Sequence, residues 1–180
     1  MQPARLSPAW AILYGTLVVG TLDIVDAFVF FGWRSGTTPV RILQSIASGW
    51  LGRAAYTGGA GVGALGAITH YFIAFGIVAT YFVVSRRVAV LTSHPIACGI
   101  VFGLFVYLFM NRVVIPLSAI GAATWPALPV LANGLLIHAF GIGIPSAVAA
   151  ASAQKSKEKS QKSKAESEIQ KKTETKRKLT

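Results

Sequence analysis

The first 154 residues of the chain almost lack charged side chains. Only 13% of the 180 residues are charged, whereas an average soluble domain has about a quarter. All nine lysines and all four glutamates lie in 155–180, and the only aspartates are Asp23 and Asp26. A long segment with so few charges cannot present a hydrated surface. The composition therefore excludes a soluble globular domain over this segment and predicts a membrane domain.

Cysteine is also scarce, and cofactor motifs that contain it are missing. Cys98 is the only cysteine, so no intrachain disulfide can form and the redox compartment is not indicated. The sequence has neither a CxxCH nor an HExxH motif. A haem would therefore have to rely on the separated histidines His70 and His138 as an axial pair.

Long apolar runs are what the sequence has in place of charge. Four runs reach the ~20 residues that a helix needs to cross a bilayer. They lie at about 9–33, 60–85, 95–117 and 126–151. The first run has no small-x-small cleavage site, so we expect a retained span and not a removed signal peptide. The predicted fold class is an all-α membrane protein with a four-helix transmembrane domain over 1–152.

A shorter segment in the first loop, TPVRILQSIASGWLG over 38–52, predicts an amphipathic helix. Its apolar residues recur at helical spacing, and its polar residues fall largely on the other side. The polar residues are Arg41, Gln44, Ser45 and Ser48. At about 15 residues the segment is too short to span a bilayer, which favours a helix lying in the interface. The alternative is a helix packed on the spans.

The segment after the last span, 153–180, is rich in lysine and almost without apolar side chains. It cannot bury enough surface to fold alone, so we predict a disordered or transiently helical tail. Beside a membrane, such a tail gains on the order of 1 kcal/mol per basic residue from anionic lipid. Lipid is therefore its expected partner. The tail has no aromatic residue to stack on bases, which argues against specific nucleic-acid recognition.

The basic residues near the span ends predict the orientation of the protein. In a four-span topology Arg5, the pair Arg86–Arg87 and the basic tail fall on one side. The opposite side has three arginines, all of them in the first loop. The imbalance predicts that both termini are cytoplasmic.

Seven polar or charged side chains interrupt the apolar spans. This candidate intramembrane cluster consists of Asp23, Asp26, His70, Asn111, Arg112, Asn133 and His138. Counting ~1.5 Å per residue from the outer span ends gives each residue a depth. Asp23, His70 and His138 form a middle layer, roughly 15–18 Å deep on this count. The other four form an outer layer at roughly 10 Å.

A charge inside a bilayer costs about 2.5–3.5 kcal/mol or more, so such groups face the interior of the bundle and pair. The two layers predict that Asp23 meets His70 or His138. They place Asp26 with Asn111, Arg112 and Asn133, and they predict that it meets Arg112 or Asn111. Because the two acids are three residues apart, both leave the same side of their helix.

The cluster leaves several functions open. We favour a structural, assembly or partner-binding role in which polar contacts hold the helices in register. The alternative is a small proton- or ion-linked transporter or channel that uses Asp23, Asp26, His70 and His138, since buried carboxylates and histidines exchange protons near neutral pH. An enzyme with an acid–base aspartate pair and a haem protein are weaker alternatives, because no further motif accompanies them. So few spans enclose little volume, and a conducting path favours a homo-oligomer.

One glycine-rich stretch, GGAGVGALG, matches the GxGxxG nucleotide-binding spacing. The match lacks its context, because no acid follows about 20 residues later and the next residues form a membrane span. Gly59, Gly63 and Ala67 instead form a small-xxx-small ridge, which lets helices approach closely in lipid. Gly99 and Gly103 predict a second such ridge in the third span.

Four segments of the chain resemble a family of small bacterial multi-pass membrane proteins of uncharacterised function. They are GTLDI in the first span, ILQSIASGWLG in the first loop, the glycine-rich entry to the span with His70, and MNRVVIPLSA at the end of the third span. The resemblance covers about 10–145 and excludes the tail. It implies a four-span protein of the inner membrane and brings no assigned activity, ligand or catalytic residue.

Overall fold

The computed structural model describes residues 7–121 and 124–178, and these two ranges contain helices and no strand. The long helices are α1 (Pro8–Ser35), α3 (Gly59–Ser85), α5 (Pro95–Phe109) and α8 (Ile144–Lys178). The short ones are α2 (Pro39–Leu51), the 3₁₀ helix η1 (Gly52–Thr57), α4 (Val90–Ser93), α6 (Ile115–Leu117) and α7 (Leu128–Leu136). Two π-helical segments, η2 (Met110–Val114) and η3 (Ile137–Gly143), continue α5 and α7.

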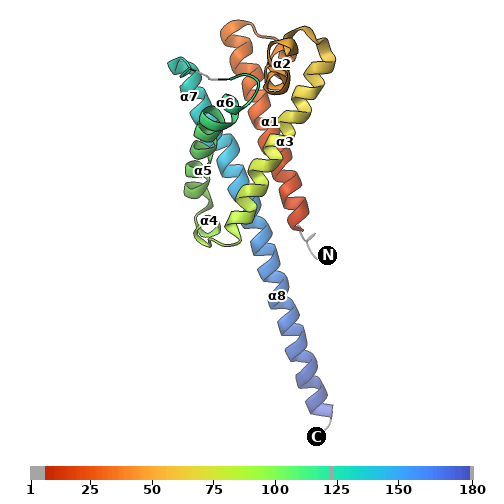
Figure 1. Cartoon of the computed structure of the whole chain (residues 1–180). Helices are drawn as coiled ribbons and strands as arrows, with labels where there is room; N and C mark the ends of the chain where they lie inside the picture. Colours follow the sequence, from red (N-terminus) through yellow and green to blue (C-terminus); the bar gives the residue numbers. More distant parts are fainter. Residues whose placement is uncertain (1–6, 122–123, 179–180) are drawn as a thin grey trace.

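Four helical stretches are long and apolar enough to cross a membrane. They are Pro8–Ser35, Gly59–Ser85, Pro95–Leu117 and Leu128–Glu174. The predicted all-α membrane fold with four spans is confirmed. Figure 1 shows the four as one bundle, with α8 running on far beyond the end at which α1 begins.

Local sequence defines both ends of α1. The hydroxyl of Ser7 caps the helix by accepting a hydrogen bond from the Trp10 N–H at 3.3 Å, and Pro8 occupies the first turn, as is common at helix starts. At the other end Gly36 adopts φ 63° and donates its N–H to the Gly32 carbonyl at 3.0 Å. This left-handed conformation suits glycine and stops the helix.

The third and fourth spans pack backbone against backbone. A Cβ atom at Gly99 would lie 2.8 Å from the carbonyl oxygen of Gly143, and one at Gly103 would overlap the carbonyl of His138. The predicted close approach at Gly99 and Gly103 is confirmed. Because lipid supplies little hydrophobic force between helices, such contact is a main source of attraction. It also holds η3, with His138, at a set depth.

The amphipathic segment predicted at 38–52 forms α2, which crosses one end of the bundle (Figure 1). Its packing does not separate an apolar from a polar side as expected, because Ile42 and Ala47 are buried and so are Gln44 and Ser48. Gln44 is 6% exposed and donates to the Gly59 carbonyl at 3.1 Å, whereas the apolar Trp50 is 63% exposed. The closest contact with α3 is at Gly66, where a Cβ would overlap the backbone of Leu43. The physical reason is the surroundings: apolar side chains face lipid without cost, and polar ones need partners inside the protein.

The glycine ridge predicted on α3 is therefore wrong in its register. Gly59 adopts φ 61° at the start of the helix, and a Cβ added there would meet no atom within 4 Å. Its contact with α2 is the hydrogen bond that its carbonyl accepts from Gln44. Gly63 does face α2, at Val40. Gly66, a member of the GxGxxG match, makes the tight contact that the spacing argument assigned to Gly59 and Ala67.

Each π-helical segment ends two residues before a proline. Pro116 follows η2, and Pro145 follows η3. Proline has no N–H to give to the carbonyl four residues earlier and its ring crowds that carbonyl. The helix relieves this by widening to i→i+5 bonding, and such π segments are frequent at functional sites. In this chain they carry Asn111, Arg112 and His138.

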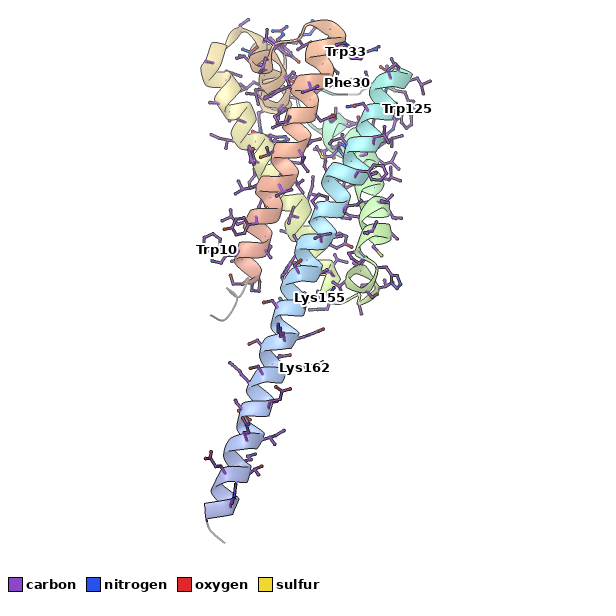
Figure 2. All side chains as sticks on the ribbon, turned by 180° about the vertical axis from the view of Figure 1, so that it is seen from behind. Trp10, Phe30, Trp33, Trp125, Lys155 and Lys162 are labelled. Atoms are coloured by element: carbon purple, nitrogen blue, oxygen red, sulfur yellow. The ribbon has the colours of Figure 1, made fainter. Side chains whose placement is uncertain are left out.

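The tail, for which the sequence predicts disorder or transient helix, continues α8 as helix to Lys178. Glu158 precedes Lys162, and Glu168 precedes Lys172, by the four residues that favour helix. Figure 2 shows Lys155 where α8 leaves the bundle and Lys162 beyond it. At this end the Gln154 amide donates to the Ser85 hydroxyl at 3.1 Å, which joins α8 to α3.

Tryptophan side chains mark both ends of the bundle. Figure 2 shows Trp33 and Trp125 at one end and Trp10 at the other. All three are more than half exposed. Aromatic residues at both ends of apolar spans are typical of the two membrane–water interfaces.

Replacing Gly103 by alanine tests the backbone packing. The added methyl group would overlap the His138 carbonyl, so we expect a loss of roughly 1–3 kcal/mol in unfolding free energy. Titration of the purified protein with SDS in mild detergent measures it. Gly76→Ala is the matched control, because nothing lies within 4 Å of its added Cβ. Equal stability of the two variants would contradict the packing argument.

Candidate functional site

Asp23 on α1 and His70 on α3 face each other inside the bundle. His70 Nδ1 lies 3.9 Å from Asp23 Oδ2, which is longer than a hydrogen bond. The other ring nitrogen, Nε2, lies 2.8 Å from the carbonyl oxygen of Gly20. A carbonyl only accepts hydrogen bonds, so Nε2 carries the hydrogen and donates it. The nitrogen that faces Asp23 is therefore the one that presents a lone pair when His70 is neutral.

This arrangement makes the Asp23–His70 pair depend on one further proton or donor. When His70 is neutral, the lone pair of Nδ1 faces a carboxylate, and two acceptors repel each other. The pair becomes attractive when either group gains a proton, or when a hydrogen-bond donor lies between them. Asp23 and His70 together thus form a site for one proton or one donor.

His138 approaches the same place from the fourth span. Its ring packs edge-on against Tyr107 of α5, with the ring centroids 5.1 Å apart. Its Nδ1 is buried and makes no hydrogen bond of regular geometry in 7–121 or 124–178, and the acceptor that the backbone offers the ring is the Gly134 carbonyl one turn earlier. Nearly all buried polar atoms in native proteins have a partner, so an orphan needs an explanation.

A cavity of about 280 Å³ connects these groups. Asp23, His70, Asn111 and His138 line it, and so does Ser45 of α2. The remaining wall is apolar and comes chiefly from isoleucines of α1, α2, α3, α6 and η3. The three residues of the predicted middle layer therefore share one cavity, and Asn111 joins them from the outer layer.

Asp26 lies one turn further along α1 and does not line this cavity. The amide of Asn133 donates to Asp26 Oδ2 at 2.7 Å, which joins α1 to α7. The outer layer placed Asp26 with Asn133, and this bond confirms that grouping. The partners first expected for Asp26, Arg112 or Asn111, are wrong. Asn111 donates to the carbonyl of Tyr107 at 2.9 Å, within its own helical stretch.

Arg112 has an aromatic partner in place of an acid. Its guanidinium carbon lies 3.5 Å from the centre of the Trp125 ring, an attractive cation–π geometry. The long side chain thus reaches the ring that marks the end of the bundle. Depth counting gave the height of each polar residue, but not the direction in which its side chain leaves the helix.

Sequence reasoning missed three parts of the site. The Gly20 carbonyl, which sets the tautomer of His70, has no sequence signal. Tyr107, which contacts His138 and accepts from Asn111, precedes Asn111 by four residues, and that helical spacing was the available signal. Ser45 belongs to the polar side of α2, and its exposure to lipid would have been costly. That cost was the clue that it faces inwards.

The arrangement bears on the metal and haem hypotheses. In the described ranges no three His, Cys, Asp or Glu residues lie close enough together to hold a metal ion. His70 Nε2 is engaged with Gly20, and only His138 offers a buried ring nitrogen without a partner. A haem between His70 and His138 would require the His70–Gly20 hydrogen bond to break, or it would have to bind His70 through Nδ1, the nitrogen that faces Asp23.

The four spans and the buried polar groups define the class: this is a multi-pass membrane protein. No protein-family model, curated protein or solved structure matches the chain. The resemblance to small bacterial four-span proteins stays a prediction.

A double-mutant cycle on Asp26 and Asn133 tests the bond between α1 and α7. We expect each alanine variant to lose about 1–2 kcal/mol of stability, with a coupling energy of roughly 0.6–1.7 kcal/mol, the range for polar pairs in membranes. SDS titration measures both. The control cycle pairs Asp26 with Asn111 and should give no coupling. Coupling of Asp26 to Asn111 and not to Asn133 would contradict the geometry.

Proposed function

We propose that this protein is a small proton- or ion-linked transporter or channel whose working site is the cavity between Asp23, His70 and His138. The observation that carries the proposal is the shared cavity, because three titratable side chains from three spans line one space inside the membrane domain. Ionisable groups in spans are costly and are typical of proton relays and solute pathways.

The contrast between the two aspartates supports this assignment. Asp26 has a hydrogen bond from Asn133 at 2.7 Å and needs nothing more to hold two helices together. Asp23 lies 3.9 Å from His70 and beside an open space. A pair that served only to fix helix register would gain most by closing to hydrogen-bond distance. The gap suits a pair that takes up and releases a proton.

A structural or partner-binding role is the second candidate, and the Asp26–Asn133 bond favours it. In this function the polar contacts hold the helices in place and the working surface belongs to an assembly, either of copies of this chain or with another membrane protein. Loss of Asp26 would then lower abundance or recovery of the partner. Loss of Asp23 would matter little.

We also propose cytoplasmic termini in a bacterial inner membrane, with the basic tail beside anionic lipid. The support is the distribution of basic residues. Arg86 and Arg87 follow α3 at the end where α8 leaves the bundle, and the lysines of α8 begin there (Figure 2). The opposite end has only first-loop arginines and Arg112, which lies on Trp125.

Proton flux into proteoliposomes tests the transport proposal. Under an imposed pH gradient the purified protein should acidify the interior of the liposomes, and a trapped pH-sensitive dye reports that change. Valinomycin and potassium balance the charge that the protons carry. We expect Asp23→Asn and His70→Asn to lower the rate to that of empty liposomes, because each removes the exchangeable proton site. His94→Asn is the matched control, since His94 is exposed and bonds to Ser93. Wild-type flux no greater than that of empty liposomes would refute the proposal.

Reporter fusions test the orientation. A fluorescent protein fused after residue 180 should fluoresce, and alkaline phosphatase inserted between Ser118 and Leu128 should be active, because only the second site would face the periplasm. Alkaline phosphatase activity at the C-terminus would place the tail outside and contradict the charge argument.

A further inference from the structure

We propose that the cavity binds a small apolar primary amine as its ammonium cation, with the nitrogen between Asp23 and His70. This assignment of the substrate class rests on the proposed function, because it uses the same site. The juxtaposition behind it is a single carboxylate and several hydrogen-bond acceptors on an otherwise apolar wall.

The charge of the wall selects a cation. Asp23 is the only carboxylate that lines the cavity, and no lysine or arginine lines it in the described part of the chain. The other titratable groups beside Asp23 are His70, His138 and Asp26. Asp26 is occupied by Asn133. An anion would meet the carboxylate without a fixed positive charge to balance it, whereas a cation supplies the missing charge.

The hydrogen-bonding groups select a donor. The hydrogen on His70 Nε2 is used by Gly20, which leaves the Nδ1 lone pair of neutral His70 facing Asp23 across 3.9 Å. An ammonium nitrogen between them reaches both atoms at an ordinary ~2.8 Å. Ammonium has three hydrogens and accepts none, so it resolves the repulsion between two acceptors that face each other.

Two more wall residues also present acceptors. The Asn111 amide hydrogen goes to Tyr107, which leaves its Oδ1 free to accept. The Ser45 hydroxyl donates to the Ile42 carbonyl at 2.6 Å, which leaves its oxygen lone pairs. Both oxygens belong to residues that line the same cavity as Asp23 and His70.

The size and apolarity of the cavity limit the rest of the ligand. At about 280 Å³ it is nearly twice the ~150 Å³ apolar cavity that holds benzene. An aryl-ethyl or branched alkyl group fits such a space. A polyamine does not suit it, because the wall has no second carboxylate for a second ammonium.

Isothermal titration calorimetry on the purified protein in detergent tests the proposal, with 2-phenylethylamine as the probe. We expect saturable binding above that of empty micelles. The neutral isostere 2-phenylethanol, the anion 3-phenylpropionate and the polyamine spermidine should bind at least ~10-fold more weakly, which is the discrimination expected of one charge-assisted hydrogen bond. Equal binding of the alcohol, or tighter binding of the anion, would overturn the proposal.

Variants locate the site. Asp23→Asn should weaken amine binding about 10-fold or more, and His94→Asn should leave it unchanged. If Asp23→Asn fails to fold, Ala27→Leu is the second test of the site. Ala27 lines the cavity, so the larger leucine side chain would fill part of the cavity volume. This variant should lose 2-phenylethylamine and retain the smaller propylamine. Its control on the same helix is Val29→Leu, at a 66% exposed position. Unchanged binding in Asp23→Asn, or in a folded Ala27→Leu, would overturn the proposal.

The flux assay distinguishes this proposal from the proposed function. Amine binding without any proton or amine flux supports the binding site and overturns the transport function. Proton flux without amine binding supports the function and overturns the substrate class. Absence of both overturns both.

Discussion

Polar groups inside a membrane span have no water to bond with, so each must find a partner in the protein. Most polar side chains of this bundle do so at short range. The hydroxyl of Thr16 donates to the carbonyl of Ile12 at 2.8 Å, and that of Ser146 to the carbonyl of Ile142 at 2.7 Å. The departures that stand out in the described residues, the orphan His138 Nδ1 and the Asp23–His70 gap, share one cavity. That coincidence is why we propose the cavity, and not the rest of the bundle, as the working site.

Backbone packing and proline placement hold these departures in position. Glycines let α5 and η3 approach until their backbones touch, which sets the height of His138. Pro116 and Pro145 each follow a π-helical segment, and the widened turns carry Asn111 and His138. A regular α-helix in either place would rotate the following side chains by part of a turn. The chemistry of the cavity thus depends on residues that never line it.

Much of the architecture and part of the site were predictable from sequence. Apolar run length gave the four spans, and residue counting put Asp23, His70 and His138 at one depth, where they line one cavity. The same counting put Asp26 and Asn133 in one layer, where they bond, but it did not single out Asn133 among the residues of that layer. Height follows from sequence position because an α-helix rises evenly. The direction of a side chain depends on helix rotation and on π-helical turns, which sequence position does not supply.

The sequence by itself determined the membrane class, the number of spans and the presence of costly polar groups within them, because these follow from composition and run length. Tertiary structure decided which polar groups meet. It turned Gln44 and Ser45 of α2 inwards, gave Asp26 a bonded partner and left Asp23 beside open space. The physical reason is that lipid accommodates any apolar outer surface equally well, so packing between the helices sets their rotation. That packing leaves Asp26 bonded to Asn133 and Asp23 lining the cavity.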